Sequence, residues 1–253
     1  MEHALQEILR IELENVTIKQ RFGKWLIPKL PFNRRTFDIL RFELNAAVAT
    51  LLNIVSIRIR RTRSELSKQE HLNINLGSAG AGHSDWVNID VNRQCKGLAF
   101  PYDIRRGLPF RDGQVARIFA EHIIEHVEFR EDLPRLMREC RRVLEVGGRL
   151  RIIVPDGERW LHAYVTGDPQ EWNDLGFPKL PSDMPTAMTM INHVFHQGGE
   201  HHFAYDYATL KWVLESAGFT IVSKMAYGVS QDQKICLDQL VHAKYSLYIE
   251  AQK

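Results

Sequence analysis

Three glycines follow directly on an apolar stretch in the first third of the sequence. The stretch Leu72–Leu76 leads into Gly77-Ser78-Ala79-Gly80-Ala81-Gly82. Glycine lacks a Cβ atom, so the backbone of such a turn can approach a ligand closely and adopt positive φ. The turn therefore predicts a binding site for a nucleotide-like ligand.

The spacing of these glycines distinguishes between nucleotide ligands. It is G-x-x-G-x-G, whereas dinucleotide-binding turns have G-x-G-x-x-G. The next acid at the end of an apolar run is Asp90, and it comes sooner than the roughly 20 residues typical of a nicotinamide site. Its carboxylate can accept hydrogen bonds from both hydroxyls of a ribose. The pattern disfavours NAD, but a tight turn followed by a surface aspartate would have the same sequence.

Two further polar residues follow predicted strands and could move protons. His122 comes just after the apolar run Val115–Ala120, and Asp156 comes just after Leu150–Val154. Open α/β sheets bind their ligands outside the carboxyl ends of the strands. Imidazole also titrates close to neutral pH, which suits a general base. We therefore expect His122 and Asp156 to be catalytic residues.

A second group of histidines lies in the long segment 168–206. These residues are His193, His196, His201 and His202, with Gly198-Gly199 between them as a hinge. Long insertions on a rigid scaffold often carry function, so we expect this segment to cover the acceptor side of the site. His201 is the third catalytic candidate, and surface histidines without a role are the alternative.

The same histidines allow two metal sites to be considered. The run His122-Ile123-Ile124-Glu125-His126 fits the H-x-x-E-H pattern of zinc hydrolases. That pattern needs a long helix, whereas this run directly follows a predicted buried strand. The second histidine group has no accompanying set of carboxylates. The sequence therefore predicts no metal site, and a zinc hydrolase remains the weaker alternative.

Short apolar runs alternate with helical stretches from His71 onward, which is typical of β/α units on a parallel sheet. A helix with Asp132 as its N-cap is expected to stop at Gly147-Gly148, and another covers Tyr207–Ala217. Before this region, apolar residues recur at helical spacing from Leu40 to Ile59 and predict one amphipathic helix. Such a helix packs on its own domain or on a second subunit more often than on a membrane. The predicted strands are 72–76, 86–90, 115–120, 150–154, 219–226 and 245–251.

Taken together, these segments resemble class I S-adenosylmethionine-dependent methyltransferases, most closely predicted methyltransferases found near bacterial surface-glycan genes. The motifs that carry the resemblance are Asn75-Leu76-Gly77-Ser78-Ala79-Gly80, Trp86-Val87-Asn88-Ile89-Asp90, Glu121-His122-Ile123-Ile124-Glu125-His126 and Ser246-Leu247-Tyr248-Ile249-Glu250-Ala251. The resemblance covers residues 71–253. It implies a Rossmann-like, seven-stranded, mostly parallel α/β sheet with an antiparallel last strand, and S-adenosylmethionine as the cofactor.

The resemblance also implies the reaction and its residues. Methyl transfer would go to an oxygen or nitrogen of an acceptor, such as a sugar of a surface glycan or its lipid-linked precursor. Asn75 stands where the wider class often has an acid, and its amide oxygen can still accept a hydrogen bond from the cofactor's ammonium group. Glu121 is a further expected cofactor contact. Gly77, Ser78 and Gly80 would line the methionine moiety of the cofactor. Asp90 would hold the ribose, and Asp103 with Ile104 would contact the adenine.

Length and charge suggest the organisation of the chain and its partners. The 253 residues fit one catalytic domain, residues 71–253, preceded by a basic helical extension, residues 1–70. The extension carries 13 of the 33 basic residues and 8 of the 31 acidic residues. We expect attraction to an anionic membrane surface, or contact with a glycosyltransferase or a second copy of the chain. Nucleic acid is unlikely because stacking aromatic residues are not interleaved with the basic ones.

Cysteine usage and the N-terminus suggest the compartment. The three cysteines show neither metal-ligand spacing nor a disulfide framework. The first residues are too acidic for a secretory signal, and no apolar run reaches the roughly 20 residues of a membrane span. We expect a cytoplasmic protein, with peripheral attachment to the inner membrane face as an option. A methyltransferase-like interaction module without activity is the alternative from a different functional class.

Overall fold

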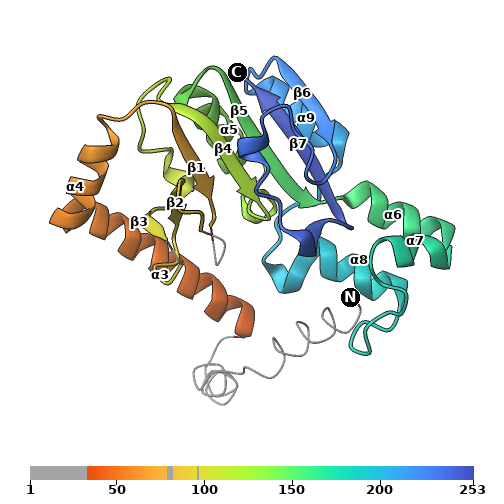
Figure 1. Ribbon diagram of the computed structural model, residues 1–253. Coiled ribbons are helices and arrows are strands. Elements are labelled where there is room, and N and C mark those ends of the chain that lie inside the picture. The colour runs from red at the N-terminus through yellow and green to blue at the C-terminus, as the bar shows by residue number, and fades with distance from the viewer. Residues whose placement is uncertain (1–32, 79–81, 96) are drawn as a thin grey trace. The chain divides into compact units, whose positions relative to one another are not determined.

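The computed structural model describes residues 33–78, 82–95 and 97–253. The chain divides into two compact units, residues 1–44 and 45–253. The second unit is built on a seven-stranded sheet with the strand order β3-β2-β1-β4-β5-β7-β6 (Figure 1). The strands are β1 Leu72–Leu76, β2 Val87–Asp90, β3 Leu98–Pro101, β4 Val115–Glu121, β5 Leu144–Pro155, β6 Ile221–Met225 and β7 Ser246–Gln252.

Strand directions in this sheet confirm the predicted fold. Strand β7 runs antiparallel to both of its neighbours, β5 and β6, and the remaining neighbours pair in parallel. The sequence predicted seven strands but located only six of them. The strand without a predicted counterpart is β3. It is four residues long, and only its last two residues, Phe100 and Pro101, are buried.

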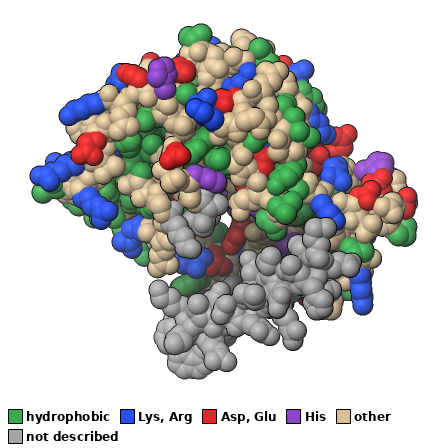
Figure 2. Space-filling view, viewed as in Figure 1, with side chains coloured by type: hydrophobic (Ala, Val, Ile, Leu, Met, Phe, Trp, Pro, Cys, Tyr) green, Lys and Arg blue, Asp and Glu red, His purple; other side chains and the backbone are tan. Residues whose placement is uncertain are grey.

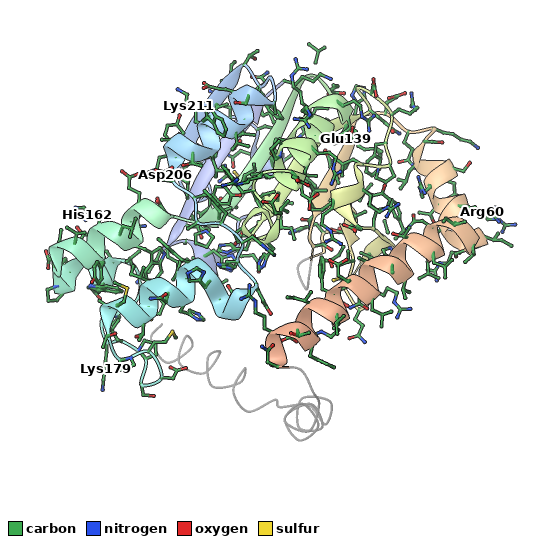
Figure 3. All side chains as sticks on the ribbon, turned by 180° about the vertical axis from the view of Figure 1, so that it is seen from behind. Arg60, Glu139, His162, Lys179, Asp206 and Lys211 are labelled. Carbon is green, nitrogen blue, oxygen red and sulfur yellow. The ribbon has the colours of Figure 1, made fainter. Side chains whose placement is uncertain are left out.

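Two helices cover one face of the sheet with apolar side chains. They are α5 Asp132–Val143 and α9 Tyr207–Ser216, and Figure 3 shows them on the same side, with Glu139 on α5 and Lys211 on α9. Both bury apolar residues at helical spacing in the main core. The inward residues of α5 are Leu133, Leu136, Met137, Cys140 and Val143, and those of α9 are Leu210, Val213 and Leu214.

The start and end of α5 differ in detail from the prediction. Glu131 occupies the N-cap position without a side-chain hydrogen bond, and Asp132 is the first helical residue. The glycines Gly147-Gly148 do not end the helix, because β5 already begins at Leu144. Gly147 has φ +81°, and the register of β5 against β4 shifts nearby, so these glycines allow an irregularity within the strand.

The other face of β4 and β5 carries charged side chains that hold a long irregular segment, residues 226–245. Arg117 Nε lies 2.6 Å from Asp232 Oδ2, and Arg151 Nε lies 2.7 Å from Asp238 Oδ1. Arg151 is fully buried and also donates to Glu250 Oε1 on β7 at 2.7 Å. Buried ion pairs therefore replace much of the apolar packing on this face.

A small satellite domain follows β5. It contains α6 Gly157–Thr166, α7 Pro169–Asp174 and α8 Ala187–His196, which Figure 1 shows grouped beyond the end of β5. These helices share a separate apolar core. The predicted insertion 168–206 is thus a folded layer that packs against α6. The buried residues of this core are Trp160, Ala163, Trp172, Leu175, Met190 and Ile191.

The predicted single helix from Leu40 to Ile59 is two helices. They are α3 Arg34–Val55 and α4 Ile57–Leu66, with a bend of 78° between them. Ser56 has an extended backbone, φ −76° and ψ 115°, and its hydroxyl caps α4. Helical periodicity continues across such a break, so the sequence pattern did not reveal it.

From residue 45 onward these helices pack with the sheet domain, as the amphipathic pattern suggested. Ile59 is part of the main core, and the Asn53 side-chain amide donates to the Pro101 carbonyl at the end of β3 at 2.7 Å. Among the described residues, neither helix alone has the length and apolarity of a membrane span, and the two meet that criterion only as a bent pair. Figure 2 shows basic side chains over α4, where Arg58, Arg60 and Arg61 are exposed.

Candidate functional site

The glycine turn, Asp90 and His122 come together at one edge of the sheet. They follow β1, β2 and β4, which are adjacent and parallel. The register pairs Leu76 with Ile89 on one side and with Ala120 on the other, so the carboxyl ends of the three strands lie level. This is the edge at which open α/β sheets bind ligands.

Gly77 is required by both its conformation and its surroundings. Its φ is +64°, and a Cβ atom there would lie 2.6 Å from Cγ1 of Ile123. Ser78 is only 3% exposed, and its hydroxyl has no hydrogen-bond partner. An unpartnered buried hydroxyl beside a glycine turn fits a turn that binds a polar ligand. Gly80, which was predicted to line the same site, lies outside the described residues.

Two buried asparagines connect the turn with the next strands. Asn75 Nδ2 donates to Asn88 Oδ1 at 3.0 Å, and the same oxygen accepts from the His83 backbone at 3.1 Å. The Asn88 amide in turn donates to the carbonyls of His83 and Gly97. The amide group of Asn75 is therefore committed to this network, and its orientation is fixed. Asn88 was not predicted from the sequence, because an asparagine within an apolar strand gives no sign of what it binds.

Replacing Asn88 by alanine is expected to destabilise the protein by about 2–3 kcal/mol, since several buried groups would lose their partner. The loop between β1 and β2 would loosen, so S-adenosylmethionine affinity is expected to fall as well. Thermal denaturation and calorimetry measure the two effects. Asn92→Ala is the matched control because this asparagine is exposed and bonds only within its own turn. Equal stability of the two variants would contradict the prediction.

Asp90 ends β2 with a partly exposed carboxylate. Its Oδ1 accepts the Asn92 backbone N–H at 2.7 Å, which sets the orientation of the side chain. Burial raises the pKa of the neighbouring Cys95 thiol to about 12, and Asp90 contributes to this shift through its charge and a hydrogen bond. Cys95 is therefore a neutral thiol and does not compete for ligands as a thiolate.

The predicted adenine contacts, Asp103 and Ile104, lie after β3. Asp103 caps the short 3₁₀ helix Ile104–Arg106 and forms an ion pair with Arg105, Nη2 to Oδ2 at 2.9 Å. A hollow of about 480 Å³ opens beside it, lined by Asp103, Arg105, Arg106, Asp132 and Arg135. The Asp103 carboxylate, which the resemblance assigns to the adenine, is thus already ion-paired with Arg105. An adenine amino group would have to bond to the same carboxylate alongside Arg105.

His122 has a strained backbone and two polar contacts. Its φ is +50°, which is uncommon for any residue other than glycine and is often found at functional sites. Nε2 lies 2.9 Å from Ser246 Oγ, and Nδ1 lies 3.1 Å from Glu125 Oε1. The ring of His242 lies against it, with 3.9 Å between centroids. Several residues therefore fix the orientation of this imidazole.

Glu125 is a buried carboxylate without a well-aligned hydrogen-bond donor. It is 1% exposed, and both side-chain oxygens lack a hydrogen bond. Burial by itself favours the neutral acid, but the contact with His122 and the nearness of His126 hold the pKa of Glu125 below its ordinary value. The anion next to His122 favours a proton on Nδ1, which leaves Nε2 as the basic nitrogen.

Glu121, predicted to contact the cofactor, is hydrogen-bonded to the segment 226–245. Its carboxylate accepts hydrogen bonds from the backbone and side chain of Gln239, both at 3.1 Å, and lies 2.9 Å from His242 Nδ1. Burial opposes ionisation, yet these contacts with His242 and Gln239 keep the pKa of Glu121 below its usual value. The sequence did not identify His242 or Ser246 as neighbours of His122, because both lie about 120 residues further along the chain.

The other two catalytic candidates, Asp156 and His201, have different surroundings. Asp156 caps α6 through the Arg159 N–H, and its Oδ2 lies 3.7 Å from Lys224 Nζ. Burial raises the pKa of Asp156. His201 is 8% exposed and lies beside Glu125 and His126. His193, His196 and His202 are exposed, as the alternative for this group anticipated.

The helix that a zinc hydrolase motif requires is not formed by these residues. His122 lies in the turn after β4, and only Ile124–His126 form a 3₁₀ helix of three residues. His122 and His126 are therefore not presented side by side on a long helix. The arrangement does not support the hydrolase alternative.

Comparison with known proteins agrees with the fold. Residues 89–152 match a family model described as "Methyltransferase domain". The matched segment is about a quarter of the chain, and it includes Asp90, Asp103 and His122. The sequence matches none of the curated proteins.

Several solved structures are similar in fold. A SAM-dependent methyltransferase from Archaeoglobus fulgidus is 17% identical, with 79% of this chain and 94% of that chain covered and a TM-score of 0.43. One from Mesorhizobium loti is 15% identical, with 77% and 96% covered and a TM-score of 0.43. Phosphoethanolamine N-methyltransferase 2 from Haemonchus contortus, in complex with S-adenosyl-L-methionine, is 11% identical, with 77% and 52% covered and a TM-score of 0.43.

Proposed function

We propose that this protein transfers the methyl group of S-adenosylmethionine to an oxygen or nitrogen of an acceptor. The observation that carries the proposal is the meeting of Gly77, Asp90 and His122 at the level ends of three adjacent parallel strands. The turn offers bare backbone and the unpartnered Ser78 hydroxyl, and Asp90 offers a carboxylate. The match of residues 89–152 to a methyltransferase domain supports the same conclusion.

The residues at this edge suggest how the acceptor would be activated. S-adenosylmethionine supplies the methyl group, and the acceptor must lose a proton as its new bond to carbon forms. With its Nδ1 proton facing Glu125, His122 presents Nε2 to Ser246, 2.9 Å away. An acceptor hydroxyl or amine that takes the place of the Ser246 hydroxyl would meet the same basic nitrogen. His122 then accepts the proton, and Glu125 stabilises the resulting imidazolium.

The proposed acceptor is a sugar of a surface glycan or of its lipid-linked precursor. This assignment rests on the sequence resemblance to methyltransferases found near glycan genes. The exposed arginines of α4 support it, because a lipid-linked sugar carries phosphate groups and lies at an anionic membrane surface. On this proposal the protein works in the cytoplasm, close to the inner face of the membrane. Five further basic residues of the extension lie outside the described residues: Arg10, Lys19, Arg21, Lys24 and Lys29.

Asp90→Ala is expected to weaken S-adenosylmethionine binding by about 100-fold, since two hydrogen bonds from ribose hydroxyls to a charged carboxylate would be lost. Isothermal titration calorimetry of the full chain measures the affinity. Asp85→Ala is the matched control, because this aspartate is exposed in the preceding loop. Full affinity in Asp90→Ala would reject the assigned cofactor site. Absence of binding to the wild type at millimolar ligand would favour an interaction module without activity.

A further inference from the structure

Three potential metal ligands converge at the carboxyl end of β4, and they come from two distant parts of the sequence. Glu125 and His126 follow β4, while His201 follows the satellite helix α8. One ligand atom from each of the three lies within 4.8 Å of the others. The Glu125 carbonyl accepts the His202 backbone N–H at 2.7 Å, so the two segments are joined directly beside this cluster.

The hydrogen bonds of both imidazoles fix which ring nitrogen carries the proton. His126 Nδ1 lies 3.0 Å from the Glu200 carbonyl, and His201 Nδ1 lies 2.6 Å from the Val194 carbonyl. A carbonyl can only accept, so each ring must carry its proton on Nδ1. Each Nε2 is then a bare acceptor. A carbonyl bonded to the outer nitrogen of an imidazole is also the usual way in which proteins orient a metal-binding histidine.

Glu125 adds a third acceptor to the cluster, and this carboxylate is nearly inaccessible. It is 1% exposed, and its Oε1 lies 3.1 Å from His122 Nδ1. Its charge and the two imidazole lone pairs repel one another unless something positive lies between them. Glu125, His201 and Tyr205 border a narrow gap without room for a water molecule, and the Tyr205 hydroxyl beside it is buried and unpartnered.

We infer that Glu125, His126 and His201 bind a divalent transition-metal ion, with Zn²⁺ as the best match. Two imidazoles and one carboxylate form the ligand set of catalytic zinc sites, which keep a fourth position open. Mg²⁺ and Ca²⁺ prefer oxygen ligands and fit this set poorly. Ligand atoms of a tetrahedral zinc site lie about 3.3 Å apart, so small side-chain movements close the site around the ion.

The sequence had suggested two other metal sites, and this one combines parts of each. It takes Glu125 and His126 from the H-x-x-E-H pattern and His201 from the second histidine group. It excludes His122, whose Nε2 is bonded to Ser246 and whose Nδ1 faces Glu125. The site therefore stands independently of S-adenosylmethionine binding. If the proposed function also holds, an ion held by Glu125 would be close enough to His122 to bind a hydroxyl of the acceptor, because His122 Nδ1 lies 3.1 Å from Glu125 Oε1.

Titration of chelator-treated full-length protein with Zn²⁺ alone tests this inference. We expect one ion per chain, and an affinity at least 100-fold weaker in His126→Ala and in His201→Ala. His202→Ala is the matched control, because this neighbouring histidine is exposed and contributes only its backbone to the cluster. Zn²⁺ is also expected to raise the melting temperature of the wild type but not of the two variants.

Two further measurements keep the test decisive. Glu125→Gln preserves the volume of the buried side chain, so it is expected to lose Zn²⁺ affinity even if an alanine variant fails to fold. S-adenosylmethionine binding is measured on the same samples, and its presence or absence reports on the proposed function alone. Weak Zn²⁺ binding by the wild type, or binding that these substitutions leave unchanged, would overturn the inference.

Discussion

His122→Gln is expected to lower kcat for methyl transfer by about 10²–10⁴-fold, the usual contribution of a general base. Glutamine retains a polar side chain of similar reach but cannot accept a proton near neutral pH. The backbone at this position has φ +50°, and Gln197 adopts φ +39° in the same structure, so glutamine is expected to be tolerated there. Transfer of a labelled methyl group from S-adenosylmethionine to the acceptor measures the rate.

Two controls separate a loss of chemistry from a loss of structure. S-adenosylmethionine affinity should stay within a few-fold of the wild type, because Asp90 and the glycine turn are not changed. His162→Gln is expected to retain full activity, since this histidine lies exposed on α6 (Figure 3). A His122→Gln enzyme with wild-type kcat would remove His122 from the reaction and leave the acceptor's base to be found elsewhere at this edge.

Arg151→Met is expected to destabilise the fold by about 3–5 kcal/mol, the typical cost of removing one partner of a buried ion pair. The guanidinium is fully buried, and its partners Asp238 and Glu250 are 2% and 3% exposed. Methionine would leave the buried Asp238 carboxylate without this counter-ion, and Glu250 would keep only the longer contact with Arg149, 3.7 Å away. For a domain of this size the melting temperature should fall by roughly 10 °C, as measured by calorimetry.

The expected cost depends on burial, so an exposed ion pair is the suitable comparison. Arg111 is 52% exposed and bonds to Glu70, which is 54% exposed. Arg111→Met is therefore expected to cost less than about 1 kcal/mol. Adding Asp238→Asn and Glu250→Gln to Arg151→Met should recover part of the lost stability, because the buried charges disappear. No recovery would mean that shape and hydrogen bonding, rather than charge, set the cost.

The fold was largely readable from local sequence because each strand is an apolar run of distinctive length. Strand β3 escaped prediction, since Leu98–Pro101 is short and ends in a proline, which rarely occurs inside a strand. The bend at Ser56 escaped for a different reason. An apolar stripe of helical period runs through both α3 and α4, and only the extended backbone of one residue separates them.

The parts of the site that follow a strand directly were also readable. Gly77 and Asp90 were chosen from the glycine turn and the acid at the end of the next strand, and His122 because ligands bind at the carboxyl ends of parallel strands. The structure brings the three to one edge. The roles of Glu121 and Asn88 depend instead on partners supplied by other loops. The positions of Glu121 and Asn88 in the sequence do not indicate which residues they bond to, so these partners could be identified only from the three-dimensional structure.

The cluster of Glu125, His126 and His201 shows the same limit more clearly. Each histidine group had been considered alone, and each lacked something that a metal site needs. The second group lacked a carboxylate, and the first lacked the helix that would present both of its histidines. A pairing across about 75 residues supplies the missing ligand. Separation along the chain, rather than unusual chemistry, kept this combination hidden.

Ile123 lies where a Cβ atom of Gly77 would be, so the wall of the glycine turn is also part of the loop that carries His122. A nucleoside bound in the turn would lie close to this isoleucine, and the neighbouring residue in the chain is His122. By thermodynamic linkage, if binding of one substrate moves this loop, the affinity of the protein for the other substrate changes as well. Binding of the methyl donor at the turn and binding of the acceptor beside His122 would therefore be energetically coupled, whichever binds first.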